Sequence, residues 1–179
     1  MQWNARSIQS RTGDLDVVLR TIQPHVIAIQ ETWLKDNMST PSFTNYITHR
    51  KDRDTGANGG GVLMLIRNNV NYIHKDIIAF QGGQIEVQAI TIKSNKQNID
   101  ILNMYNPIGN MNKLEFLHYK SQLNAKYFIV GDLNGHNPLW EPTKNPQTNN
   151  CGKTLQEIIT ENDDIALITP PDLPTYVHS

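Results

Sequence analysis

A short apolar run in the second half of the chain ends in residues that could do chemistry. Residues 127–130 are largely apolar and are followed by glycine, a pattern that favours a short strand buried on both faces. Asp132 and Asn134 come next, two positions apart, so both side chains would point to the same side of an extended backbone. Such a pair could hold a water molecule and a phosphate oxygen. The alternative is an ordinary turn, because Asp and Asn bond their own backbone and Gly135 permits positive φ.

Two further polar side chains stand in or after predicted strands near the start of the chain. Residues 2–8 and 25–30 are predicted strands, and apolar residues at helical spacing between them predict a helix that closes before Pro24. Asn4 lies in the first strand, and Glu31 directly follows the second. A carboxylate at a strand end could belong to a polar site, but a solvated strand end explains it equally well.

The rest of the sequence predicts one α/β domain over residues 1–179, with strand-rich sheet flanked by helices. Further strands are expected from residue 46 and over residues 62–66, 70–78, 84–93, 98–105 and 165–168. One helix is expected over residues 112–123, with Leu114, Leu117 and Leu123 toward the core, and another around Leu155, Ile158 and Ile159. Gly59, Gly60 and Gly61 indicate a loop tip rather than a phosphate cradle, because no Gly-Lys-Ser/Thr follows them.

The composition limits the classes of partner. The 179 residues are 38% hydrophobic and carry a formal charge of −1, so the chain is expected to be globular and has no global positive field. Contact with DNA would therefore need a local basic patch. The candidate cations for such a patch are Arg50, Lys51, Arg53, Arg67 and Lys144.

Cysteine usage and hydropathy point to a soluble protein of a reducing compartment. The single cysteine, Cys151, cannot form an internal disulfide, and no Cys/His cluster has zinc-ligand spacing. The first residues lack the basic and apolar regions of a signal peptide, and no apolar run reaches membrane-spanning length.

Four motifs in combination carry a family resemblance. They are Trp-Asn-Ala-Arg-Ser at 3–7, Gln-Glu-Thr-Trp-Leu at 30–34, Asn-Met-Tyr-Asn-Pro at 103–107 and Gly-Asp-Leu-Asn-Gly-His-Asn-Pro-Leu-Trp at 131–140. In this order the chain resembles the endonuclease/exonuclease/phosphatase superfamily, and most of all the apurinic-type endonuclease domain of non-LTR retrotransposons, which is associated with an RNA-directed DNA polymerase. The resemblance runs from Gln2 to Thr175.

The resemblance implies a deoxyribonuclease-like fold, a two-sheet α/β sandwich flanked by helices, and Mg²⁺-dependent nicking of DNA, with Mn²⁺ as the alternative cation. By resemblance, Glu31 anchors the metal with help from Asn4, Asp132 orients the attacking water, and Asn134 donates to phosphoryl oxygens. The remaining implied contacts to phosphate or DNA come from Tyr105, Thr175, Arg50 and Arg53. A nuclear location follows from the implied substrate alone, and the sequence indicates no partner protein.

One departure from the family pattern leaves alternatives open. In the complete domain the Pro-Thr segment is followed by an Asp-bearing strand and a Ser-Asp-His motif, whereas this sequence stops at Ser179, and His178 lacks the preceding Ser-Asp. We therefore expect a domain without its last strand or strands. The alternatives to a nicking enzyme are a truncated, weak or inert remnant that binds metal or DNA, and a phosphatase or phosphodiesterase acting on a lipid or inositol phosphate.

Overall fold

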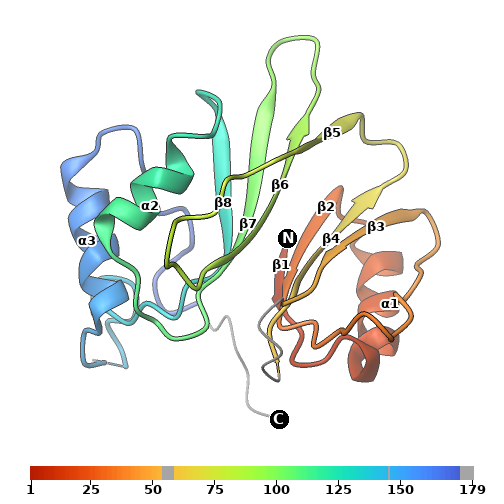
Figure 1. Ribbon diagram of the computed structural model, residues 1–179, viewed down its shortest axis with the longest axis horizontal. Coiled ribbons are helices and arrows are strands. Elements are labelled where there is room, and N and C mark those ends of the chain that lie inside the picture. The colour runs from red at the N-terminus through yellow and green to blue at the C-terminus, as the bar shows by residue number, and fades with distance from the viewer. Residues whose placement is uncertain (54–58, 145, 174–179) are drawn as a thin grey trace. The chain divides into compact units, whose positions relative to one another are not determined.

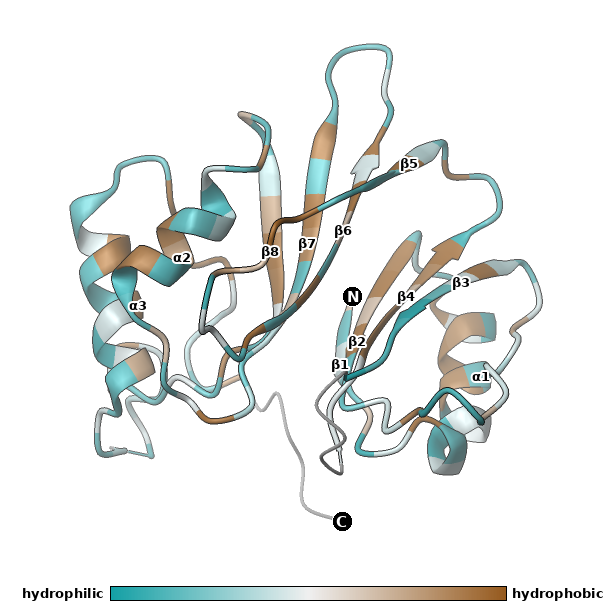
Figure 2. Cartoon of the chain, in the orientation of Figure 1, coloured by the Kyte–Doolittle hydropathy of each residue, from teal (hydrophilic) through white to brown (hydrophobic). Residues whose placement is uncertain are grey.

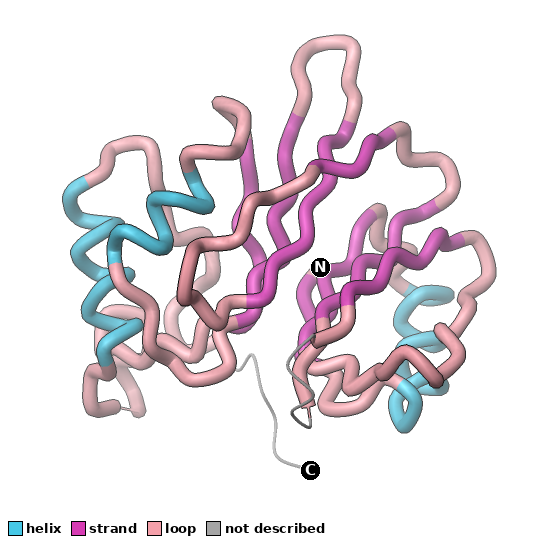
Figure 3. Tube along the Cα trace, viewed as in Figure 1, coloured by secondary structure: helices cyan, strands magenta, loops and turns pink. Residues whose placement is uncertain are grey.

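The chain is organised as two compact units. The computed structural model describes residues 1–53, 59–144 and 146–173 (Figure 1). The first unit comprises Met1–Ala79, Glu86–Tyr105 and Gln122–Asp132. The second comprises Phe80–Ile85, Asn106–Ser121 and Leu133–Ser179. The β-strands, magenta in Figure 3, all belong to the first unit.

One sheet of the first unit has the strand order β1-β2-β4-β3. Its strands are β1 (Gln2–Asn4), β2 (Val26–Gln30), β3 (Tyr46–Lys51) and β4 (Val62–Arg67). Strand β1 runs parallel to β2, whereas β4 is antiparallel to both of its neighbours. Strand β2 is buried throughout, and β4 is buried up to Arg67. This confirms the prediction that continuous apolar runs form central strands.

The other sheet has the order β5-β6-β7-β8. Its strands are β5 (Tyr72–Lys75), β6 (Glu86–Ile92), β7 (Ile99–Tyr105) and β8 (Tyr127–Asp132). Neighbouring strands are antiparallel except for β7 and β8, which are parallel. Strand β8 was predicted to be buried on both faces, and this is wrong: Phe128 is 46% exposed. The reason is its position, since β8 ends the strand order and has β7 as its one neighbour in the sheet.

The two sheets and helix α1 (Thr12–Thr21), which follows the short 3₁₀ helix η1 (Gln9–Arg11), form an α/β sandwich. Helix α1 lies against one face of the first sheet (Figure 1). Its Leu15 and Leu19 pack in a core that includes Ile27, Ile29, Leu63 and Leu65. Because side chains alternate along a strand, Val26, Met64 and Ile66 face the other way, and they pack with Ile90 of β6. Strands β2 and β4 are largely brown in Figure 2, which marks hydrophobic residues. The predicted fold class is confirmed.

The second unit contains helices α2 (Lys113–Lys120) and α3 (Asn150–Glu161), which lie in contact. Asn112 and Asn149 cap them, because the two side chains accept hydrogen bonds from the N–H groups of Glu115 and Gly152. The prediction that Leu114 points to the core is wrong, since Leu114 is 72% exposed. The buried face of α2 instead carries Glu115, Phe116 and Tyr119, because the larger aromatic side chains remove more apolar area from water.

Other expectations differ at the ends of the chain. The strand predicted over residues 2–8 ends at Asn4, and the backbone then turns through positive φ at Arg6 and Ser7. No strand forms over residues 165–168, where Ile168 is 71% exposed and no other strand of the described part pairs with it. Within residues 1–53, 59–144 and 146–173, no helix combines the length and the hydropathy needed to cross a bilayer.

Candidate active site

Side chains from four strand ends of the first unit meet in one place, which we call the carboxylate cluster: Asn4, Glu31, Tyr105 and Asp132. The Nδ2 atom of Asn4 donates to Glu31 Oε1 at 2.8 Å and to Asp132 Oδ2 at 2.6 Å. The Tyr105 hydroxyl is hydrogen-bonded to Glu31, and Tyr105 is paired with Asp132 in the parallel register of β7 and β8. The structure thus brings together four residues that are up to 128 positions apart in the sequence.

The two parallel strand pairs explain this convergence. Asn4 ends β1 beside Gln30 of β2, and Tyr105 ends β7 beside Asp132 of β8. Parallel neighbours present their carboxyl ends at the same edge of a sheet, and β1 and β2 contact β8 across the sandwich. The polar residues that follow buried apolar segments therefore gather at one edge.

Glu31 reaches the cluster because its backbone leaves the strand conformation. Gln30 already faces the opposite sheet, so in a regular strand Glu31 would point toward α1. Glu31 instead has φ 53°, a left-handed conformation that costs a non-glycine residue about 1–3 kcal/mol. Backbone bonds on both sides hold this bend: Ser7 N–H donates to Glu31 O at 2.9 Å and Thr32 N–H to Gly61 O at 3.2 Å.

A buried chain of amides supports the cluster from within the sandwich. Gln2 Nε2 donates to Gln30 Oε1 at 2.5 Å, and Gln30 Nε2 donates to Asn103 Oδ1 at 2.6 Å. Asn103 Nδ2 in turn donates to the carbonyl oxygens of Ile29 and Leu63 at 3.0 and 3.2 Å. We call Gln2, Gln30 and Asn103 the amide chain. Sequence reasoning assigned them no role; the available signal was their place one or two residues before Asn4, Glu31 and Tyr105.

Arg53 lies beside the cluster, held by an acid that sequence reasoning missed. Its Nε donates to Glu86 Oε1 at 2.5 Å, and its guanidinium carbon lies 5.8 Å from the centre of the Tyr105 ring. Glu86 also accepts a bond of 2.6 Å from the N–H of Gly61. The Nη2 atom of Arg53 is buried and has no hydrogen-bond partner in the described part of the chain. An unpaired buried donor next to Tyr105 is suited to an incoming anion.

Gly61 is required by this arrangement. Its φ is +84°, and a Cβ atom there would lie 2.4 Å from Thr32 Oγ1. The close approach allows the loop 59–61 to bond both the segment after Glu31 and the carboxylate of Glu86. As predicted, the three glycines lead directly into a strand, β4, and residues 59–61 lie against the Glu31 segment.

The electrostatics keep the Tyr105 hydroxyl protonated. Burial raises the pKa of Tyr105 far above its usual value, and the charge and hydrogen bond of Glu31 and the charge of Asp132 raise it further, while Arg53 opposes them. At neutral pH Tyr105 therefore serves as a hydrogen-bond donor.

The donor set of the cluster fits a hard divalent cation. Asn4 Oδ1 is buried and has no hydrogen-bond partner among the described residues, although it lies on the amide that holds both carboxylates. An amide oxygen and carboxylate oxygens are ligands that Mg²⁺ accepts, with waters completing its shell. No group of three or more His, Cys, Asp and Glu side chains in the described ranges is arranged around a common metal position. The protein ligands would thus be few.

Asn134 belongs to the second unit, and its local structure fits the turn alternative rather than the extended pair. The extended backbone on which its predicted orientation depended ends at Asp132, and Asn134 has φ 48°. Its Nδ2 donates to the carbonyl of Asn106 at 2.8 Å, and its own carbonyl accepts from Asn149 at 2.6 Å. The segment after β8 is thus a turn fastened to the residue that caps α3.

The predicted substrate-binding residues have different surroundings. Arg50 is engaged within the protein, since its guanidinium donates to the carbonyls of Met38 and Lys35 at 2.7 and 2.8 Å and to Asp52 at 2.5 Å. Of the two arginines, both of which the structure describes, it is Arg53 that lies beside Tyr105 with an unpaired donor. Thr175 lies outside the residues that the structure describes.

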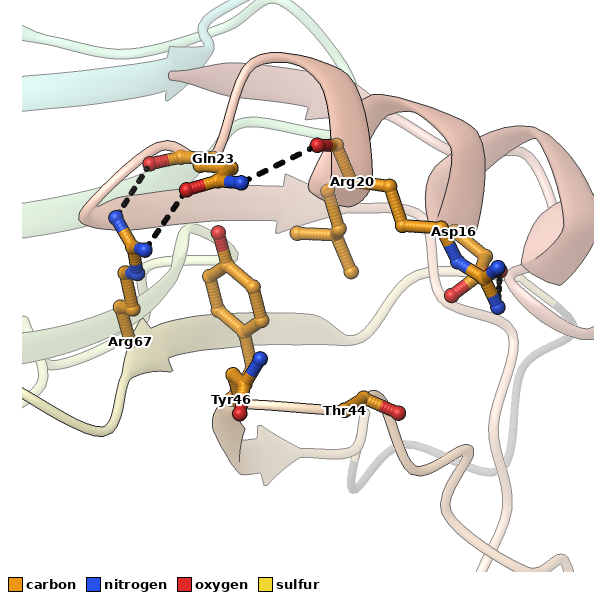
Figure 4. A pocket seen from close by; sticks show the side chains of 8 residues that line it. Asp16, Arg20, Gln23, Thr44, Tyr46 and Arg67 are labelled. Carbon is orange, nitrogen blue, oxygen red and sulfur yellow. Dashed lines mark hydrogen bonds and ion pairs between the residues drawn. The ribbon is translucent and has the colours of Figure 1, made fainter.

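A separate pocket of about 300 Å³ lies at the other end of the first sheet (Figure 4). It is lined by Asp16, Leu19, Arg20, Gln23, Thr44, Asn45, Tyr46 and Arg67. Tyr46 pairs with Arg67 at one end of the β3–β4 register, whereas Gln30 pairs with Val62 at the opposite end. Arg67, a candidate for DNA contact, therefore stands apart from the cluster and donates to Gln23 Oε1 at 2.8 Å.

The described strands form two packed sheets with α1 on the outside, so the chain is an α/β sandwich. Its polar site residues gather at one edge of the sheets. A sequence model of the endonuclease/exonuclease/phosphatase family matches residues 1–177, and the chain belongs to this family. The resemblance drawn from the four motifs is confirmed. A comparison of the sequence with curated proteins gives no match.

Solved structures with similar folds include a retrotransposon endonuclease domain, an AP endonuclease and a 3' phosphatase. The endonuclease domain of TRAS1, a telomere-specific non-LTR retrotransposon, has a TM-score of 0.65 and 13% identity over 89% of this chain and 70% of its own. The AP endonuclease LMAP from Leishmania major has a TM-score of 0.66 and 12% identity over 89% of this chain and 65% of its own. The 3' phosphatase NExo from Neisseria, bound to a product DNA hairpin, has a TM-score of 0.60 and 13% identity over 89% and 69%. At these identities the likeness establishes the fold.

Proposed function

We propose that the chain is a metal-dependent phosphodiesterase of retrotransposon origin that nicks DNA. The observation that carries this proposal is the bridge made by Asn4, whose Nδ2 holds Glu31 and Asp132 together while its Oδ1 stays buried and unpaired. Placing the carboxylates of Glu31 and Asp132 close to the unpaired Asn4 Oδ1 raises the free energy of the folded state unless a cation binds between them. The fold shared with the TRAS1 endonuclease domain and with NExo bound to DNA supports DNA as the substrate.

The residues of the cluster divide the work of hydrolysis. Glu31 and Asn4 Oδ1 would hold Mg²⁺ or Mn²⁺, which when bound polarises a phosphoryl oxygen. Asp132 would accept a hydrogen bond from the attacking water and orient it, and Tyr105, held protonated, would donate to the phosphate. The Nη2 of Arg53 would pair with a phosphoryl oxygen. Asn134 is proposed to donate to the phosphate as well, and Thr175 to contact it.

The proposal is tested by incubating the chain with supercoiled plasmid, with Mg²⁺ or Mn²⁺ and with EDTA. We expect relaxed circles with either cation and none with EDTA. Because a positioned acid–base group contributes about 10²- to 10⁴-fold, Asp132→Asn should slow nicking by at least about 10²-fold. Glu31→Gln should do the same. Asp14→Asn is the matched control, since Asp14 is an exposed carboxylate of α1.

Plasmid nicking and a phosphate-release assay together separate the alternatives. A chain that nicks nothing with either cation contradicts the proposal. Nicking that appears only once a C-terminal segment with Ser-Asp-His is added would select the alternative in which residues 1–179 alone are weak or inert. Release of phosphate from an inositol phosphate or a phosphoinositide, without nicking, would identify the lipid-type phosphatase.

Contact with the DNA backbone is tested through salt. If Arg53 pairs with a phosphate, the logarithm of the affinity for DNA should fall linearly with the logarithm of the salt concentration, and Arg53→Gln should make that slope less steep by about one. An unchanged slope in that variant would exclude the role. The proposed substrate also implies a nuclear location, which fluorescence imaging of the tagged chain would test.

A further inference from the structure

Trp33 is an exposed aromatic side chain on the segment that follows Glu31. Its side chain is 43% exposed, whereas its neighbours Thr32 and Leu34 are 1% and 4% exposed. The segment thus buries the residues on either side and presents the indole to solvent. Single exposed hydrophobic side chains are common on protein surfaces, but Trp33 stands two positions after Glu31 of the carboxylate cluster, where a bound ligand would bury its large apolar ring.

The backbone holds Trp33 in this position. Its φ is 56°, a left-handed conformation that an aromatic residue rarely adopts. The N–H of Trp33 donates to Gly60 O at 2.9 Å, next to the bond between Thr32 and Gly61. Backbone conformations of this kind persist where the surrounding bonds over-determine them and are concentrated at ligand sites.

The indole of Trp33 lies close to the Arg53 guanidinium. A Cβ atom on Gly59 would be 3.4 Å from Trp33 Nε1, and one on the next residue, Gly60, would be 2.2 Å from Arg53 Nε. Consecutive Cα atoms are about 3.8 Å apart, so the indole nitrogen and the Arg53 guanidinium lie within roughly 12 Å of each other. A nucleotide strand that places a phosphate at Arg53 can therefore bring a base to Trp33.

We propose that Trp33 is a stacking platform for an unpaired nucleobase of the DNA strand whose phosphate lies at Arg53 and Tyr105. This inference rests on the proposed function and specifies its substrate: a strand with at least one base out of the duplex stack beside the scissile phosphate. Paired bases keep their faces covered by neighbouring pairs, whereas an unstacked base offers a free face to an exposed indole. Stacking on an aromatic side chain accepts any base, so Trp33 selects the unpaired state and carries no sequence code.

The test measures binding without hydrolysis. A single-stranded oligonucleotide, and a strand of equal length in which the central nucleotides are abasic, are titrated onto the chain in EDTA at fixed salt. We expect the wild type to prefer the strand with bases. Trp33→Ala should bind that strand at least about fivefold more weakly and bind the abasic strand as the wild type does. Trp33→Phe should keep most of the preference, because phenylalanine retains a face for stacking.

The control is Phe128→Ala, which removes an aromatic side chain of similar exposure, 46%, from β8. Thermal melting of each variant shows that it is folded. Unchanged affinity of Trp33→Ala for the strand with bases would overturn the proposal, as would wild-type protein that binds neither strand. Base-dependent binding without any plasmid nicking would instead contradict the proposed function and leave the stacking site standing.

Discussion

Gln30 and Asn103 share a fully buried hydrogen bond of 2.6 Å that joins the two sheets of the sandwich. Each residue is one or two positions before a member of the carboxylate cluster, so the bond fixes how β2 and β7 end relative to each other. The site depends on this distance, because Glu31 and Tyr105 come from opposite sheets. A buried polar network with all members paired specifies one arrangement of a core that apolar packing alone would leave less unique.

Removing the Asn103 side chain should therefore destabilise the first unit. Asn103→Ala leaves Gln30 Nε2 without its acceptor in a dry interior and takes a donor from two carbonyls. We expect a loss of about 2–4 kcal/mol in the free energy of unfolding, measured with urea. Asn98→Ala is the control, because Asn98 is exposed and should change stability by less than about 0.5 kcal/mol. Equal effects of the two substitutions would show that the amide chain is dispensable.

Divalent cations should stabilise the chain through Glu31. A cation at 100 times its Kd stabilises the folded state by about 2.7 kcal/mol, which raises the Tm of a chain of this size by about 5–10 °C. Glu31→Gln should lose most of this rise. Asn4→Asp should melt earlier than the wild type in EDTA, because it adds a third carboxylate to the two that Asn4 bridges, and should gain more from Mg²⁺. The same Tm with EDTA and with Mg²⁺ in all three proteins would rule out a metal at the cluster.

The pattern of hydrophobic residues in the sequence predicted much of this fold, because apolar residues mark the positions that become buried. The continuous apolar runs of β2 and β4 became central strands, and the helical spacing of Leu15 and Leu19 became the face of α1 that covers the sheet. The pattern failed where burial depends on distant neighbours. Phe128 has an apolar side chain in an apolar run, but its exposure is decided by the position of β8 in the strand order.

The motifs singled out Asn4, Glu31, Tyr105 and Asp132, which the structure brings together. The backbone conformation that brings Glu31 to the cluster could not be predicted from them. Glu31 turns inward through a positive φ that depends on bonds to Gly61, which comes thirty positions later. Glu86 likewise gains its role only when β6 lies beside β7 and pairs it with Tyr105. Such relations arise from tertiary contacts, so no local pattern of residue types announces them.

Two glycines should respond in opposite ways to alanine. A Cβ on Gly131, just before Asp132, would lie 1.8 Å from the carbonyl oxygen of Met104, so Gly131→Ala must push β8 away from β7. We expect a loss of more than about 2 kcal/mol in unfolding free energy and slower nicking. Gly13 lies in α1, where an added methyl group would meet no atom within 4 Å, and Gly13→Ala should stabilise the helix by about 0.5–1 kcal/mol. Thermal melting of both variants checks this, and a stabilised Gly131→Ala would contradict the packing of β8 on β7.

Asp100 should make stability depend on pH in acid. It is fully buried and accepts hydrogen bonds from Thr91 Oγ1 at 2.7 Å and from Asn124 N at 2.7 Å, with Lys75 Nζ at 3.1 Å. Burial works against its charge, but these bonds outweigh it and hold the pKa of Asp100 below its usual value of 3.8. The folded state therefore favours the carboxylate, so its contribution is complete above the unfolded pKa and is lost as the pH falls from near 4 through the folded pKa. Asp100→Asn should lower the free energy of unfolding by about 1–3 kcal/mol at pH 7. Between pH 5 and pH 2, roughly the range over which such a carboxylate titrates, the unfolding free energy of this variant should decrease less steeply than that of the wild type. Asp36→Asn, at an exposed position, should leave the wild-type slope in place. Urea unfolding at several pH values in this range measures the effect. If the unfolding free energy of Asp100→Asn falls with pH as steeply as that of the wild type, the loss of stability in acid comes from other groups.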